Sequence, residues 1–238
     1  MYPSARAASH LPTCRPRPDA DRRLSDDDAV SETETTFLLV RHGATAHTAQ
    51  RRFSGCTGAN LPLSDIGERQ AAALARNLPR SSGAITAVVA SPVLRAAQTA
   101  QILADALSLP LNVEDDLREI DFGQWEGLTA DEIDSTWPGG LDAYRADADH
   151  QPPGGEAVSS VATRVRAVRK RVAAAHPGAT VLVVSHLYPV RLSVLDALGA
   201  PLESVHRISL EPTGVSEVSG VGNTAQLLRH NDFSHLSS

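Results

Sequence analysis

The stretch Phe37-Leu38-Leu39-Val40-Arg41-His42-Gly43-Ala44-Thr45 decides the fold, because a run of apolar residues ends abruptly in Arg-His-Gly. A short run of β-prone residues predicts a buried strand, and Gly43 lets the chain turn sharply as it leaves the sheet. In open α/β sheets, ligands bind outside the carboxyl ends of the strands, where His42 is then expected. Taken alone, the tripeptide is better explained by an Arg and a His that merely cap a strand.

Three later stretches also place an Arg, a Glu or a His where an apolar strand ends or a loop begins. They are Ser91-Pro92-Val93-Leu94-Arg95-Ala96-Ala97-Gln98-Thr99-Ala100, Leu117-Arg118-Glu119-Ile120-Asp121-Phe122-Gly123-Gln124-Trp125-Glu126-Gly127 and Val183-Val184-Ser185-His186. Four motifs in this order are far more specific than any one of them. Together they resemble the histidine phosphatase superfamily, also called the phosphoglycerate mutase-like family. The resemblance runs from about Thr36 to the end of the chain.

The composition bounds the size and the partners of the protein. The chain has 238 residues, of which 42% are hydrophobic, enough for one well-buried domain and marginal for two. Aromatic residues make up only 4%, so the core is expected to consist of Leu, Val, Ile and Ala, as is usual where helices pack on a parallel sheet. The formal net charge of -6 argues against a nucleic-acid-binding surface.

The cysteines and the hydropathy pattern indicate a cytoplasmic chain. Cys14 and Cys56 show neither metal-like spacing nor a disulfide framework. No stretch approaches the roughly eighteen consecutive apolar residues that a membrane span requires. The first 23 residues lack the apolar segment of a secretory signal. We therefore expect no metal, no cofactor, no membrane partner and no nucleic-acid partner.

The chain divides into a tail and one domain. Residues 1–34 are rich in Pro, Ser, Arg and Asp and nearly free of large apolar side chains, so they are predicted to be disordered. Residues 35–238 are predicted to form the domain. Its expected strands are 37–41, 85–90, 109–113, 180–184, 207–210, 214–218 and 225–228, and its helices begin near Ser64 and Ser91 and span 130–135, 158–175 and 187–198. The stretch 46–62 is expected to be a loop over the site.

Alternating strands and helices predict an α/β fold. Right-handed crossovers then cover both faces of a mostly parallel sheet, which gives a three-layer α/β/α sandwich of the phosphoglycerate mutase-like type. The helix at 158–175 also carries a basic cluster, Arg164, Arg166, Arg169, Lys170 and Arg171, lying largely off its apolar stripe. Such a cluster can bind phosphates or RNA, but a solvated polar face explains it better.

The motif residues suit the chemistry of a phosphomonoester. Arg41 and Arg95 can each engage two phosphate oxygens through a rigid guanidinium fork. Their charges, together with burial, should lower the pKa of His42 and keep its ring neutral and nucleophilic near about pH 7. The family resemblance implies that His42 is the residue that becomes phosphorylated. His186 is expected to donate a hydrogen bond to a phosphate oxygen and so to stabilise the transition state.

A single carboxyl group can protonate the leaving alkoxide and later deprotonate water. Glu119 is the candidate. Asp121 and Glu126 lie nearby, but the resemblance places the family's acid/base at the first Glu of the motif, and Glu126 is better explained as ordering the loop.

The remaining site residues follow from the resemblance or from nearness to the motifs. Thr48 stands where many family members have an Asn that contacts phosphate, and Ser54 stands where a hydroxyl often does so. Ala44 and Ala157 replace frequent polar residues and should alter the rim. The substrate rim is assigned, by nearness to the motifs alone, to Arg52, Phe53, Trp125, Tyr188 and Arg191.

The function predicted from these residues is metal-independent hydrolysis of a small phosphorylated metabolite through a phosphohistidine. The loop that follows Glu119 resembles the phosphatase branch of the family, including α-ribazole phosphatase-like members. Two alternatives remain open. One is a phosphoglycerate mutase, which returns the phosphoryl group to its substrate, and the other is an inactive module that binds a phosphorylated ligand.

The tail yields the first testable prediction. Deleting residues 1–33 should leave activity and melting temperature nearly unchanged, because this segment has little apolar surface with which to dock on the domain. Thermal unfolding and turnover of the full and truncated chains measure this. A large loss of either would show that the tail packs on the domain.

Overall fold

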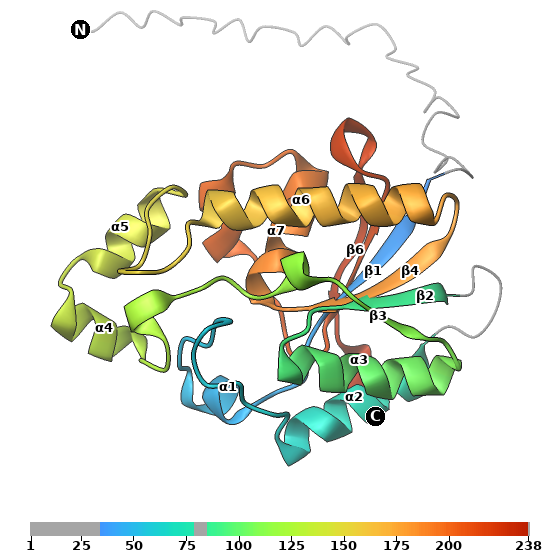
Figure 1. The fold of residues 1–238 in the computed structure, drawn as a ribbon, viewed down its shortest axis with the longest axis horizontal. Helices are drawn as coiled ribbons and strands as arrows, with labels where there is room; N and C mark the ends of the chain where they lie inside the picture. The colour runs from blue at the N-terminus through green and yellow to red at the C-terminus, as the bar shows by residue number, and fades with distance from the viewer. Residues whose placement is uncertain (1–33, 79–84, 238) are drawn as a thin grey trace, which may run out of the picture. The chain divides into compact units, whose positions relative to one another are not determined.

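The computed structural model describes residues 34–78 and 85–237, so the predicted tail lies outside the described residues. A six-stranded sheet with the strand order β3-β2-β4-β1-β5-β6 forms the centre of the described chain (Figure 1). Its strands are β1 (Thr36–Arg41), β2 (Ile85–Ala90), β3 (Leu111–Val113), β4 (Thr180–Ser185), β5 (Val215–Ser219) and β6 (Gln226–Asp232). The first four are parallel, and β5 runs antiparallel to its neighbours β1 and β6. The predicted α/β class with a mostly parallel sheet is confirmed.

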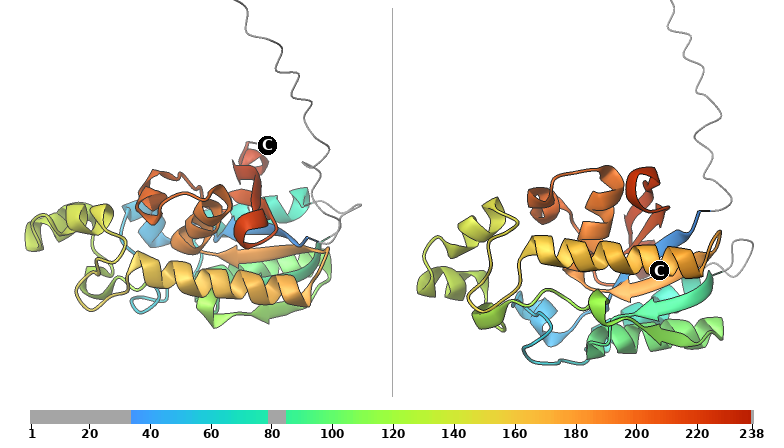
Figure 2. Two further views of the ribbon diagram at one scale, coloured as in Figure 1. Left: turned by 90° about the horizontal axis from the view of Figure 1, so that it is seen from above. Right: turned by 45° about the horizontal axis from the view of Figure 1, so that its top comes forward.

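Helices cover both faces of this sheet (Figures 1 and 2). On one face lie α2 (Asp65–Asn77) and α3 (Leu94–Leu107), and on the other lie α6 (Val158–Ala175) and α7 (Leu187–Leu198). Side chains alternate along β1 as they must in a strand, so Leu38 and Val40 pack with α2 and α3 while Phe37 and Leu39 pack with α6 and α7. This alternation produces the predicted three layers.

The register of the strands brings their carboxyl ends to one line. Arg41 of β1 lies opposite Ser185 of β4, and Ala90 of β2 lies opposite Val184. The pairing continues one residue further, because the N–H of His42 donates to the carbonyl of Ser185 at 2.9 Å. The residues that directly follow the three strands therefore sit side by side.

A third apolar cluster lies beyond this sheet edge and forms a cap. It joins α4 (Ala130–Thr136), α5 (Gly140–Ala146) and the loop before them to the first turns of α6 and to α7. Its largest fully buried side chains are Trp125, Tyr144, Ile120, Ile133 and Leu195. The cap therefore packs aromatic residues at the end of the molecule where the strand carboxyl termini meet.

Three segments differ from their predicted structure. The expected loop at 46–62 begins with a short helix, α1 (Ala46–Gln50), because Thr45 and Thr48 cap its first turn reciprocally. The Gly-rich stretch after α4 forms α5. The strand predicted at 207–210 is absent, since residues 202–207 form a 3₁₀ turn and the carbonyls of Ser209 and Leu210 bind side chains instead of a neighbouring strand.

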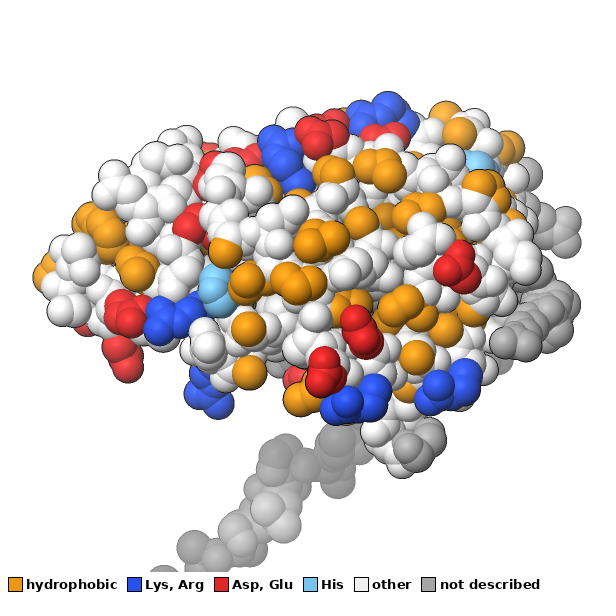
Figure 3. Space-filling model, turned by 60° about the horizontal axis from the view of Figure 1, so that its bottom comes forward, with side chains coloured by type: hydrophobic (Ala, Val, Ile, Leu, Met, Phe, Trp, Pro, Cys, Tyr) orange, Lys and Arg blue, Asp and Glu red, His pale blue; other side chains and the backbone are white. Residues whose placement is uncertain are grey.

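Three boundaries also moved, and the largest change is in β6, which extends to Asp232 instead of the predicted end at 228. Helix α3 begins at Leu94, so Pro92 precedes it, and β3 is shorter than the predicted 109–113. On the face in Figure 3, acidic and basic side chains are interspersed among apolar ones, as on ordinary protein surfaces. Among the described helices, none combines the length and the apolar character needed to cross a membrane.

The solvated face predicted for the basic cluster of α6 is wrong for two of its residues. Arg169 is only 3% exposed, and its guanidinium pairs with Asp196 at 2.9 Å and donates to the carbonyl of Gly220 at 2.8 Å. Arg164 is half-buried and bonded to the loop that carries Glu119. Acidic partners, Glu156 for Arg164 and Asp196 for Arg169, neutralise the two residues that turn inward.

The buried ion pair yields a stability prediction. Arg169→Met should lower the free energy of unfolding by about 3 kcal/mol, because it leaves a carbonyl and part of the Asp196 carboxylate without their buried partner. Arg166→Met is the matched control, since Arg166 binds the other oxygen of Asp196 from an exposed position. It should cost less than about 1 kcal/mol. Urea denaturation measures both variants, and equal losses would contradict the prediction.

Candidate active site

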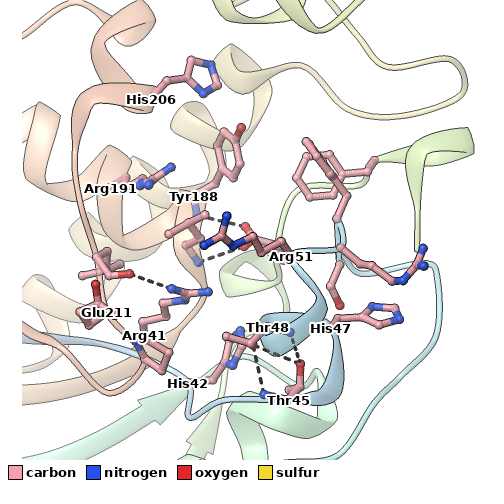
Figure 4. Close-up of a pocket in the computed structure, with 18 of the residues that line it drawn as sticks. Arg41, His42, Thr45, His47, Thr48, Arg51, Tyr188, Arg191, His206 and Glu211 are labelled. Atoms are coloured by element: carbon pink, nitrogen blue, oxygen red, sulfur yellow. Dashed lines mark hydrogen bonds between the residues drawn. The ribbon is translucent and has the colours of Figure 1, made fainter. Parts of the chain in front are cut away.

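A cavity of about 510 Å³ opens at the carboxyl edge of the sheet, between the sheet and the cap (Figure 4). Nine of the residues predicted for the site line it: Arg41, His42, Thr48, Arg52, Phe53, Ser54, Glu119, Tyr188 and Arg191. Arg95 and His186 do not line it but lie against His42. The structure thus brings together residues from four separate sequence motifs.

His42 follows β1 and is held as a neutral ring with a defined tautomer. Its Nδ1 lies 2.7 Å from the carbonyl of Gly43, which can only accept, so Nδ1 carries the proton. The lone pair on Nε2 then accepts the Nε–H of Arg95 at 3.1 Å. Burial, followed by the charges of Arg95 and Arg41, lowers the pKa of His42 well below its usual 6.5.

The two predicted arginines are anchored by backbone carbonyls and keep free donors. Arg95, from α3, donates through Nη2 to the carbonyls of Ser54 and Gly55 at 2.9 and 3.0 Å. Arg41 donates through Nη1 to the carbonyl of Leu210 at 2.7 Å. Burial lowers the pKa of Arg41 to about 10, which still leaves its guanidinium charged near neutral pH.

His186 follows β4 and is fully buried, with its ring centre 5.1 Å from that of His42. Its Nε2 lies 2.8 Å from Oγ of Ser91, the residue that follows β2. The same Oγ accepts the N–H of Val93, and Nε2 of His186 is the one acceptor that the described residues offer to the Ser91 hydroxyl proton. We therefore assign the hydroxyl as the donor and the imidazole proton to Nδ1.

Three buried donors near His42 have no partner among the described residues: Arg41 Nε, Arg95 Nη1 and His186 Nδ1. Buried polar groups are normally hydrogen-bonded, and an unpaired one costs about 1–3 kcal/mol. Three unpaired donors beside one imidazole, two of them on guanidinium groups, form a site suited to a tetrahedral anion.

Glu119 is held at the first turn of α7. Its carboxylate accepts from the N–H groups of Ile120 at 3.0 Å, Leu187 at 2.9 Å and Tyr188 at 3.1 Å. The side chain is only 3% exposed. Burial raises the pKa of Glu119, against the charges of Arg95 and Arg41 and the backbone hydrogen bonds, which lower it. A carboxyl group with a raised pKa is suited to proton transfer.

Arg164 fixes the loop that carries Glu119. Its guanidinium donates to the carbonyls of Asp116, Arg118 and Glu119 at 2.6, 2.6 and 3.2 Å, and it pairs with the carboxylate of Glu156. The sequence contained no local signal for this role, because the loop lies 45 or more residues away along the chain. Helix α6 therefore positions the acid of the site.

The two other acids of the loop have structural partners. Glu126 accepts from the N–H groups of Gly55 and Phe122, in agreement with the expectation that it orders the loop. Asp121 accepts from the hydroxyl of Thr57 and the N–H of Gly123. Among the described residues, no group of three or more His, Cys, Asp or Glu side chains is arranged to hold a metal.

The polar residues predicted from the resemblance lie on the cavity wall. The Oγ1 of Thr48 accepts the N–H of Thr45 at 3.1 Å, so this hydroxyl is engaged in the cap of α1. The carbonyl of Ser54 accepts a hydrogen bond from Arg95, and Ser54 is among the residues that line the cavity.

Trp125 was wrongly assigned to the rim. It is 1% exposed, does not line the cavity and packs in the cap against Phe53, Trp137 and Tyr144. Nearness to the Glu119 motif was a poor guide here, because successive loop residues point in different directions. Twelve lining residues were missed instead, and six of them are ionisable: His47, Arg51, Tyr144, Arg145, His206 and Glu211. These six come from α1 and the residue that caps it, from α5 and from segments after α7, where no motif marked them.

Comparisons with known proteins agree with this geometry. Residues 37–233 match the sequence profile of the histidine phosphatase superfamily (branch 1). Over 184 residues the chain is 44% identical to the bifunctional protein Rv2228c of Mycobacterium tuberculosis, which covers 77% of this chain and 50% of that protein. The chain therefore spans about half the length of this relative.

Two further relatives are covered almost in full. Phosphoserine phosphatase 1 of Hydrogenobacter thermophilus is 29% identical over 202 residues, which is 84% of this chain and 93% of that protein. The crystal structure of the α-ribazole phosphatase from Shigella flexneri superposes with a TM-score of 0.72 and 26% identity, covering 83% of this chain and 96% of that one. The predicted resemblance to α-ribazole phosphatase-like members is confirmed.

The buried imidazoles predict a pH-dependent stability. Burial lowers the pKa of His42 and of His186 well below 6.5, so the unfolded chain binds more protons than the folded chain below that pH. The stabilisation is present above about pH 6.5 and is lost as the pH falls, by up to about 1.4 kcal/mol per pH unit for each ring. His186→Asn should reduce this slope by up to that amount in urea titrations between about pH 6.5 and pH 5. His150→Asn, outside the site, is the control, and an unchanged slope in the His186 variant would contradict the prediction.

Proposed function

The chain belongs to branch 1 of the histidine phosphatase superfamily, and from this we propose that it hydrolyses a small phosphomonoester through a phosphohistidine on His42. The observation that carries the proposal is the presence of three unpaired buried donors on residues that surround that imidazole, Arg41, Arg95 and His186. Relatives named as phosphatases support hydrolysis as the overall reaction. The activity is assigned to the domain predicted at residues 35–238.

In the proposed first step the phosphate binds between the two guanidinium groups. Its oxygens compete for the Nε–H of Arg95 and so release the lone pair of His42 Nε2. This nitrogen attacks phosphorus, and the bond to the ester oxygen breaks. The free N–H of His186 and the two arginines stabilise the charge that spreads over the phosphoryl oxygens. The two guanidinium groups supply the positive charge that the phosphoryl oxygens need, so this step requires no metal.

Glu119 supplies the proton that the leaving oxygen needs. Because burial raises its pKa, its acidic form persists to a higher pH than that of an exposed Glu. The proton moves to the leaving alkoxide, which departs as an alcohol and leaves a carboxylate. The rate of this step should fall as the pH rises through the raised pKa of Glu119.

The second step regenerates the site. The Glu119 carboxylate takes a proton from water, whose oxygen attacks phosphorus while the bond to Nε2 breaks. Inorganic phosphate leaves, His42 is neutral again and Glu119 is protonated again. One carboxyl group thus serves both half-reactions, as its three backbone hydrogen bonds hold it in one position.

Rapid quenching with a radiolabelled phosphomonoester tests the proposal. We expect a protein-bound label that is labile in acid and stable in alkali, as phosphohistidine is, and that is unaffected by chelator. His42→Ala should abolish the label and nearly all turnover. Glu119→Gln should slow poor leaving groups by about 10²-fold or more and good leaving groups much less.

Three outcomes would overturn or redirect the proposal. An acid-stable label, or activity that chelator removes and Mg²⁺ restores, excludes His42 as the nucleophile. Transfer of the phosphoryl group back to substrate without net release of phosphate would indicate the mutase. The control is Glu211→Gln, which removes another carboxylate of the cavity wall and should leave the dependence on the leaving group unchanged.

A further inference from the structure

One arginine of the cavity differs from all other buried arginines of the described chain. Seven arginines are buried at least in part: Arg41, Arg52, Arg95, Arg118, Arg164, Arg169 and Arg191. The first six donate hydrogen bonds to described protein groups. Arg191 donates none among the described residues, and its Nε is buried without a partner. Its guanidinium therefore has neither a hydrogen-bonded nor an ion-paired partner among the described residues.

Arg191 stands on the cavity wall away from His42. It lies in α7, four residues after Leu187, whose N–H holds Glu119, and thus about 6 Å further along the helix axis. Figure 4 shows it on the same wall as Arg41, between Arg41 and His206. If the scissile phosphate sits at His42, this guanidinium faces the leaving group of the substrate.

Two phenol groups lie in the same region. The hydroxyl of Tyr144 is buried and makes no hydrogen bond of good geometry with a described residue, although it lies close enough to the Tyr188 hydroxyl for each to shift the pKa of the other, and Tyr144 lines the cavity. Its ring centre is 6.4 Å from that of Tyr188 and 5.6 Å from that of His206. Burial raises the pKa of Tyr144 and raises that of Tyr188 to about 12, so both phenols keep a proton to donate.

The described acids that line the cavity form no ion pair with Arg191. Burial lowers the pKa of Arg191 and the charge of Glu119 raises it. The Glu119 carboxylate is bound by three backbone N–H groups, however, and Glu211 is exposed beside Arg41. Burial and then the charges of Arg191 and Arg145 lower the pKa of His206 to about 4. The wall is therefore cationic at Arg191, and His206 adds a neutral ring. A half-buried, unpaired cation costs free energy that an anionic ligand would offset.

We propose that Arg191 and Tyr144, together with Tyr188, form a second anion subsite, and that the substrate carries a carboxylate or a second phosphate on its leaving group. The guanidinium fork suits either group, because both present paired oxygens. The inference rests on the proposed function in placing the scissile phosphate at His42. A cavity of about 510 Å³ has room for both anionic groups of a small metabolite.

Two substrate pairs that differ only by one anionic group test the subsite. O-phosphoserine and O-phosphoethanolamine differ by a carboxylate, and glucose 1,6-bisphosphate and glucose 6-phosphate differ by a phosphate. In at least one pair, kcat/KM should be about tenfold or more higher for the member with the extra anion. Arg191→Met should lower kcat/KM of that member by about tenfold or more and that of its partner by less than about threefold, while Arg191→Lys restores part of the loss.

The control variant is Arg207→Met, which removes an exposed charge next to His206 that does not line the cavity. Arg207→Met should keep the preference for the anionic member. This result would show that Arg191→Met acts through a lost contact with the substrate and not through a lower positive charge near the cavity. Equal losses for both members of a pair in Arg191→Met, or no preference in either pair, would overturn the inference.

Binding measured without turnover separates this inference from the proposed function. The four compounds are titrated calorimetrically against the His42→Ala chain and against the same chain with Arg191→Met. If the His42→Ala chain prefers the anionic members, Arg191→Met removes that preference, and the unsubstituted chain releases no phosphate from any of the four compounds, the subsite is supported and the hydrolase is refuted. Phosphate release with equal binding of both members would refute the subsite alone.

Discussion

The site depends on one constraint, the common register of three parallel strands. Hydrogen bonding between β1, β4 and β2 forces their carboxyl ends onto one line, so that His42, His186 and Ser91 meet although they are far apart in the chain. The turn after β1 then needs a residue without a side chain, because a Cβ at Gly43 would lie 2.5 Å from the carbonyl oxygen of Gly67. Helix α2 can therefore begin directly against the site.

This arrangement concentrates positive charge that the protein itself leaves unmatched. Arg41 and Arg95 donate some of their N–H groups to backbone carbonyls, which fix the orientation of each guanidinium without neutralising its charge. The adjacent imidazoles of His42 and His186 remain neutral, because protonation would add a positive charge to a buried site that already holds two arginines. A neutral imidazole at His42 and the unpaired donors beside it are thus two consequences of the same electrostatic field.

Helices α6 and α7 together fix the position of Glu119. Glu119 belongs to neither α6 nor α7, yet Arg164 of α6 binds the carbonyls around it and the first turn of α7 binds its carboxylate. The same first turns of α7 carry Tyr188 and Arg191 into the cavity. The position of the Glu119 carboxyl group and the cavity wall at Tyr188 and Arg191 therefore both depend on one helix.

The sequence by itself determined the sheet, the long helices and the residues that follow the strands. The predicted helices 158–175 and 187–198 agree with α6 and α7, because apolar periodicity depends on neighbours within a few residues. The motif around Arg41 and His42 could be placed at a strand end for the same reason. Only the tertiary structure decided that Trp125 is buried in the cap, that Arg169 turns into the core and that Tyr144 and Arg145 reach the cavity. Those outcomes depend on packing between segments that are distant in sequence. The residues next to a side chain in the sequence do not indicate which distant segment it will contact.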